Sequence, residues 1–156
     1  MKLRLVVVGR DRQDPLCLAA GEYLTRIERY YPIQLVEVRE EPARASTPLD
    51  RVRQVEAERI RKALPDDAYW IVLDERGKEL GSVDLAKRLG TWAGEGRSEI
   101  AFVIGGPGGL DPALAQAARE RWSLSKLTLP HRLARLLLAE QLYRACTILR
   151  GEPYHK

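Results

Sequence analysis

The chain has 156 residues and a formal net charge of +4, with 45% hydrophobic and 31% charged residues. This length suits one compact domain, residues 1–156, and the composition excludes a wholly disordered protein. No apolar run approaches the roughly 18 residues of a membrane span. Because no small-residue cleavage site follows the first apolar run, that run predicts a strand rather than a signal peptide, and we expect a cytoplasmic protein.

The two cysteines, Cys17 and Cys146, are too few and too isolated for a disulfide framework or a zinc site. Both lie in apolar stretches that favour small buried hydrophobic side chains in a reducing compartment. We therefore expect neither a disulfide nor a metal.

The surplus of positive charge lies in the C-terminal third. Residues 111–156 contain eight Lys and Arg against four Asp and Glu, whereas the first 110 residues contain 18 of each sign. Such a surplus attracts a polyanion, although about half of these side chains will only solvate helix faces. The basic residues are Arg119, Arg121, Lys126, Arg132, Arg135, Arg144, Arg150 and Lys156.

Strand and helix patterns alternate along the chain. Apolar, β-branched runs predict strands at residues 3–8, 33–38, 69–74 and 100–104, with a less regular fifth stretch at 123–129. Asp14 and Asp111, each followed by proline, are typical helix caps, and Thr47 and Ser82 predict two more. The predicted helices are residues 15–31, 48–64, 82–93, 112–122 and 132–149. This order predicts an α/β fold, a parallel sheet with helices on both faces.

In such sheets, ligands bind beyond the carboxyl ends of the strands. That rule indicates residues 73–75, 105–109 and 124–129 as the site. Residues 105–109, GGPGG, directly follow the most apolar strand. One glycine would be enough for a tight turn, so four in five residues favour a ligand close to the backbone. The run fits neither the dinucleotide fingerprint nor the P-loop, which disfavours conventional NAD or ATP binding.

The stretch SLSKLTL at residues 123–129 has two interpretations. It is either an edge strand with one wet face, or a loop that offers backbone N–H and C=O groups to a base edge above a floor of leucines. The last predicted helix, residues 132–149, also has two interpretations. Since it is apolar on more than one face, it is a central core helix or it packs against a second copy, and a dimer is favoured.

The sequence resembles a known family on four segments: FVIGGPGGL, WSLSKLTLPH, RLLLAEQLYRA and the closing PYH, in that order and spacing. They are similar to the RlmH family of ribosomal RNA methyltransferases, small members of the SPOUT superfamily. The resemblance runs from the first strand to the terminal PYH.

The resemblance implies a C-terminal trefoil knot, a homodimer and S-adenosyl-L-methionine as methyl donor. It implies methylation of N3 of a pseudouridine in the helix 69 loop of 23S rRNA, on the assembled ribosome, with RNA phosphates held by arginines between residues 119 and 150. The implied cofactor-binding residues are Leu73, Gly105, Leu124, Ser125, Lys126, Leu127, Thr128 and Leu129.

The acceptor is an imide nitrogen whose proton must leave, so a base or a positive charge nearby would help. His155 and Tyr154 in the tail, with Arg144, are the catalytic candidates, while His131 could equally cap the last helix. Frayed termini are normally solvent-exposed, so these roles require an ordered tail.

Three positions depart from the family pattern. Arg132 replaces the second proline of LPHP, Gly108 stands where larger residues are common, and Cys146 stands where a Trp is common. Two other classes of function remain open, a non-catalytic ribosome-binding α/β protein and a flavodoxin-like nucleotide-binding protein.

Overall fold

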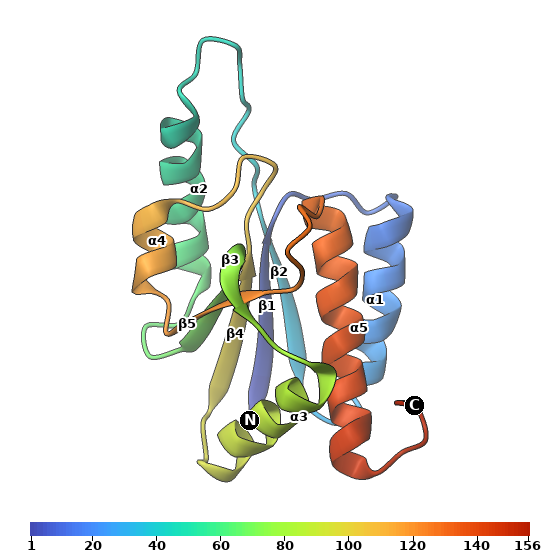
Figure 1. The fold of residues 1–156 in the computed structure, drawn as a ribbon. Coiled ribbons are helices and arrows are strands. Elements are labelled where there is room, and N and C mark those ends of the chain that lie inside the picture. The colour runs from blue at the N-terminus through green and yellow to red at the C-terminus, as the bar shows by residue number, and fades with distance from the viewer.

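The computed structural model describes residues 1–156 and contains one five-stranded parallel sheet, in the order β2-β1-β4-β3-β5 (Figure 1). The strands are β1 (Lys2–Val8), β2 (Ile33–Val38), β3 (Tyr69–Glu79), β4 (Glu99–Ile104) and β5 (Glu120–Ser123). The helices are α1 (Pro15–Ile27), α2 (Leu49–Ala63), α3 (Ser82–Gly94), α4 (Pro112–Ala117) and α5 (His131–Arg150).

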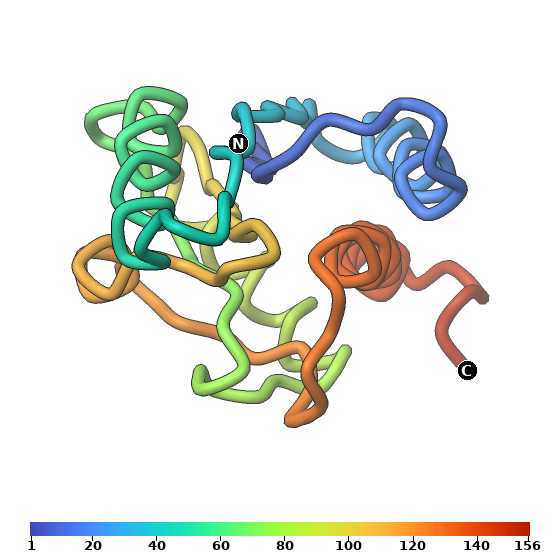
Figure 2. The backbone as a smooth tube through the Cα atoms, turned by 90° about the horizontal axis from the view of Figure 1, so that it is seen from above, coloured from blue at the N-terminus to red at the C-terminus, as the bar shows by residue number.

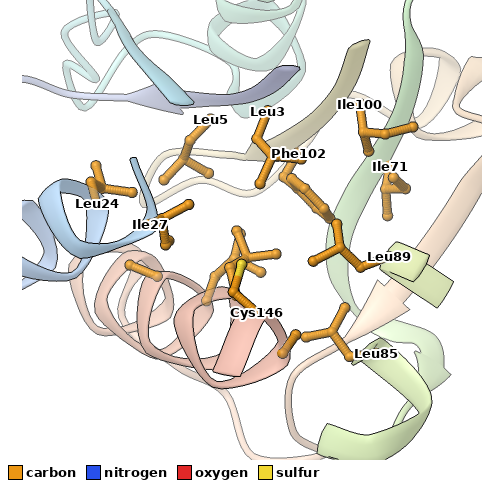
Figure 3. Packing of buried hydrophobic residues seen from close by; sticks show 14 of the residues in the cluster. Leu3, Leu5, Leu24, Ile27, Ile71, Leu85, Leu89, Ile100, Phe102 and Cys146 are labelled. Carbon is orange, nitrogen blue, oxygen red and sulfur yellow. The ribbon is translucent and has the colours of Figure 1, made fainter. Parts of the chain in front are cut away.

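Helices cover both faces of the sheet, which confirms the predicted α/β class. On one face, α1, α3 and α5 enclose the larger core, where Leu5, Phe102 and Cys146 are fully buried (Figure 3). On the other face, α2 and α4 pack on a smaller cluster that includes Val6 and Val103. The core interpretation of α5 is therefore confirmed within one chain. Both cysteines are free thiols.

The fifth strand lies earlier in the chain than predicted, and the helix predicted to reach residue 122 ends at Ala117. The cause is tertiary: Trp122 is buried and stacks on Trp92 with ring centroids 5.7 Å apart, and β5 pairs with β3. Residues 124–129 make no backbone–backbone hydrogen bond, so this stretch is a loop and not an edge strand.

Two of the four predicted helix caps are confirmed. Asp14 accepts hydrogen bonds from the Leu16 and Cys17 amides, and Asp111 accepts one from the Leu114 amide. Thr47 caps nothing, because Pro48 occupies the cap position, and Ser82 lies inside α3 behind Gly81. No helix combines the length and the apolar character needed to cross a membrane.

Candidate functional site

The carboxyl ends of three neighbouring strands, β4, β3 and β5, bring the predicted cofactor segments together. Leu73 of β3 lies opposite Ile104 on one side and Trp122 on the other. Adjacent strands lie about 4.8 Å apart, so Leu73 and the chain just beyond Ile104 and Trp122 share one short edge. The three segments inferred separately from strand ends therefore lie together at one edge of the sheet (Figure 2).

The glycine loop, residues 105–109, is folded tightly back on itself. The Gly109 amide donates to the Gly106 carbonyl at 3.0 Å, and Gly109 has a φ of 83°. A Cβ on Gly105 would lie 3.0 Å from the Leu110 side chain, and one on Gly106 would lie 2.9 Å from Val8. Side chains at 105 and 106 are therefore disfavoured by packing, and both glycines are buried at the base of the loop.

Helix α2 supports this loop from the side. The Arg53 Nε donates to the Gly108 carbonyl at 2.7 Å, and Glu56, only 3% exposed, packs against Gly106. Burial raises the pKa of the Glu56 carboxyl above its usual value, although a hydrogen bond from the Glu41 amide opposes the shift. This support could not be predicted, because α2 is a charged helix whose glutamates have no distinguishing pattern.

We predict that Glu56→Gln raises stability at neutral pH. With a folded-state pKa above the unfolded value of 4.5, the ionised carboxyl destabilises the fold at pH 7, and this cost disappears as the carboxyl becomes protonated at lower pH. Glutamine keeps an acceptor for the Glu41 amide. Thermal unfolding of both proteins should give a higher Tm for the variant at pH 7 and equal values below about pH 4.5. A lower Tm at pH 7 would mean that the charge itself stabilises the loop.

The segment 124–129 presents its backbone to the same edge. None of its N–H or C=O groups pairs with another backbone group. Two of them bond to side chains: the Leu127 amide donates to the Ser125 hydroxyl, and the Ser125 carbonyl accepts from the Ser123 hydroxyl. Thr128 donates to Glu75, which fastens the segment to the chain after Leu73. Such a row of free donors and acceptors can bind the edge of a nucleoside base.

A cavity of about 280 Å³ lies beside this segment, between the start of α3, the end of β5 and α5. Leu124 is the one predicted cofactor residue that lines it, together with Leu85, Trp122 and Leu138. The lining is mostly apolar, so the cavity suits an uncharged planar group next to the free backbone of 124–129.

β3 crosses directly over β5 at Gly77, beyond the strand predicted at residues 69–74. A Cβ on Gly77 would lie 2.5 Å from the backbone carbonyl carbon of Trp122. After a break in register, β3 pairs again with β5 through Lys78 and Glu79. This close crossing holds the chain after Leu73 against the start of the 124–129 segment.

The three catalytic candidates from the C-terminal part of the chain form one cluster around Glu140. The Arg144 Nε donates to Glu140 at 3.0 Å, and the Tyr154 hydroxyl donates to the same carboxylate at 3.1 Å. The Arg144 guanidinium lies 3.3 Å from His155 Nδ1 and stacks over the Tyr154 ring. The tail is thus ordered. Burial raises the pKa of the Tyr154 phenol, so Tyr154 stays protonated at neutral pH.

One chain does not bring this cluster to the cofactor segments. α5 begins beside them at His131, and Arg144 lies thirteen residues further along, about 20 Å down the helix axis. In Figure 1 the tail accordingly lies at the end of α5 opposite to the 124–129 segment. A site that combines both parts needs a second copy of the chain.

His131, for which the sequence allowed either a catalytic role or a helix cap, lies at the same edge of the sheet as the candidate cofactor segments. Its Nε2 atom lies 3.6 Å from the Cβ position of Gly9, with the Glu40 carboxylate 3.7 Å from the same point. Pro130, not His131, occupies the cap position of α5. Burial lowers the pKa of the His131 imidazole, and the neighbouring Arg132 charge lowers it further, which favours the neutral ring at pH 7.

Comparisons with known proteins show the family of the chain. The family described as "Predicted SPOUT methyltransferase" matches residues 1–155. A protein of Anaeromyxobacter sp. named ribosomal RNA large subunit methyltransferase H is 50% identical over the full length of both chains, and one of the same name from Gemmatimonas aurantiaca is 46% identical.

Solved structures share the fold. A protein of Haemophilus influenzae, titled a "probable methylase family protein", superposes with a TM-score of 0.55, at 15% identity, over 99% of this chain and 70% of its own. No three His, Cys, Asp or Glu side chains are grouped in a way that could hold a metal ion. The full-length matches decide the family: the chain is a member of the SPOUT methyltransferases, in the group named ribosomal RNA large subunit methyltransferase H.

Proposed function

We propose that this protein is an S-adenosyl-L-methionine-dependent methyltransferase that modifies N3 of a pseudouridine in the helix 69 loop of 23S rRNA. The names of its relatives support an rRNA substrate. The observation that carries the proposal is the convergence of Leu73, the glycine loop and residues 124–129 on three adjacent strand ends. The assembled ribosome is the proposed substrate particle and the cytoplasm the proposed location.

The residues present fit this cofactor. Gly105 and Gly106 leave backbone rather than side chain at the edge, the 124–129 segment offers unpaired amides and carbonyls, and Leu124 lines an apolar cavity. When bound, S-adenosyl-L-methionine supplies a sulfonium methyl group that is already a good electrophile. The chain's main contribution is therefore alignment of the acceptor nitrogen with that methyl group.

The acceptor N–H must lose its proton, and the tail cluster has suitable groups for this. Because Tyr154 stays protonated, it acts as a hydrogen-bond donor, and His155 is the one of the three catalytic candidates that can accept a proton. Arg144 supplies a positive charge that stabilises the nucleobase anion left when the acceptor N–H loses its proton.

The protein acts as a homodimer in this proposal. The outer face of α5 carries half-exposed apolar side chains, including Leu133 and Leu137. A two-fold axis perpendicular to α5 would place two such helices antiparallel, with the tail cluster of each beside the 124–129 segment of the other. The crossing of β3 over β5 at Gly77 is consistent with a chain whose C-terminal segment is threaded into a trefoil knot.

Methyl transfer from labelled S-adenosyl-L-methionine to ribosomal particles tests the proposal. Intact ribosomes and isolated large subunits should be compared, and the modified nucleotide mapped by mass spectrometry. Label at one pseudouridine of 23S rRNA, with ribosomes preferred, is the expected result. Ribosome binding without transfer would support the non-catalytic alternative, and a flavin-coloured protein would support the flavodoxin-like one.

A further inference from the structure

Ion pairs in the folded chain neutralise part of the positive charge counted in the C-terminal third of the sequence. In the C-terminal third, Arg132 is paired with Asp11 and Asp14, while Arg135 and Arg144 each have an acidic partner. Arg135 is also only 3% exposed. All three arginines are therefore ion-paired, Arg135 in the interior and Arg132 and Arg144 at the partly exposed surface, and the surplus counted along the sequence overstates the unpaired positive charge of this region.

Four unpaired arginines lie on two loops of the neutral N-terminal part. The loop between β1 and α1, residues 9–14, carries Arg10 and Arg12, and the loop between β2 and α2, residues 39–48, carries Arg39 and Arg44. All four side chains are exposed and none has a carboxylate within 4.0 Å.

Three of the four acids of the same two loops are ion-paired. Asp11 and Asp14 are held by Arg132, and Glu41 is held by Arg59. Only Glu40 has no basic partner among them. Counted with their partners Arg59 and Arg132, the two loops bring six arginines against four carboxylates, a local positive surplus that the balanced composition of residues 1–110 conceals.

Both loops lie at the carboxyl edge, on the side of β1 and β2, next to the candidate cofactor segments. In Figure 1 the 39–48 loop projects beyond the glycine loop and every other part of this edge, and Figure 2 looks down onto it. The 9–14 loop is tied by Arg132 to the start of α5, directly after the 124–129 segment. Arg132, one of the departures from the family pattern, therefore links the two parts of the edge.

We propose that loops 9–14 and 39–48 form the surface that holds the RNA backbone, with Arg10, Arg12, Arg39 and Arg44 on phosphates. This inference rests on the proposed rRNA methyltransferase function. Phosphate contacts fix the position of a nucleic acid without reading its sequence. Contacts at this edge would position the acceptor base beside the methyl donor, whereas the unpaired Arg150 lies at the far end of α5.

The test compares two variants with a matched control. The double variants Arg10→Gln/Arg12→Gln and Arg39→Gln/Arg44→Gln each remove two positive charges. The control, Arg29→Gln/Arg61→Gln, removes two exposed and unpaired charges at the opposite edge, just after α1 and near the end of α2. Affinity for ribosomal particles is measured by co-sedimentation at increasing KCl, with heats of S-adenosyl-L-methionine binding recorded in parallel.

Each loop variant should bind ribosomal particles about tenfold more weakly at 100 mM salt, and the slope of log affinity against log salt should fall by about two. Cofactor binding should not change, and the control should behave as wild type. Loop variants with wild-type affinity and slope would overturn the inference, as would an equal loss in the control. Because particle binding needs no catalysis, a wild type that binds but does not methylate would refute the proposed function alone.

Discussion

Replacing Gly77 with alanine is expected to lower the free energy of unfolding by about 3 kcal/mol, and to weaken cofactor binding with it. The new Cβ would lie 2.5 Å from the Trp122 carbonyl carbon and 2.7 Å from that of Arg121. These are backbone atoms that cannot rotate away, so β3 and β5 must separate. Separation would disrupt the pairing of Lys78 with Trp122 and shift the start of the 124–129 segment. Denaturant unfolding and calorimetric titration with S-adenosyl-L-methionine measure the two effects.

Gly94→Ala is the matched control for this substitution. Gly94 is exposed at the end of α3, and its added Cβ would meet nothing within 4 Å. Alanine there should leave stability unchanged or raise it by up to about 1 kcal/mol. If Gly77→Ala were as stable as Gly94→Ala, the crossing at Gly77 would not be the tight contact described above.

Two inactive variants of this protein are expected to restore activity when their subunits are exchanged. Gly105→Val blocks the glycine loop, because even a Cβ there would lie 3.0 Å from Leu110. Tyr154→Phe/His155→Ala removes the polar groups of the tail. In a homodimer of either variant, both sites carry the same defect, and methyl transfer should fall about 100-fold or more. In exchanged heterodimers, one of the two sites combines an intact loop with an intact tail.

Half of the dimers in such a mixture are heterodimers with one sound site, so about a quarter of wild-type activity should return. The same proteins mixed without subunit exchange should stay inactive. An exchanged mixture that remains inactive would contradict the supply of the tail by the partner. Full activity of Tyr154→Phe/His155→Ala by itself would exclude the tail from catalysis.

Local sequence signals were enough to predict most of the strands and helices. The apolar β-branched run of β1 and the capping Asp14 act over a few residues, and the structure follows them closely. The candidate cofactor segments could also be located, because a parallel sheet brings its strand ends to one edge. That rule needs only the order of strands and helices.

Features that depend on distant contacts could not be predicted. Residues 118–122 resemble the end of a helix, but the stacking of Trp122 on Trp92 and the pairing with β3 make residues 120–123 a strand. Gly77 looks like a turn glycine until β5 passes beneath it. The pairing of Arg132 with the 9–14 loop is equally invisible in the sequence, since its partners lie more than a hundred residues away.

Calorimetric titration of the protein with S-adenosyl-L-methionine tests most directly whether adjacent strand ends β4, β3 and β5 form a cofactor site. Wild type should bind one molecule of S-adenosyl-L-methionine per chain, and Gly105→Val should give no heat of binding. Gly108→Ala should retain it, because its Cβ would meet only the tip of the exposed Leu49 side chain. No heat from the wild type, or unchanged binding by Gly105→Val, would contradict the site.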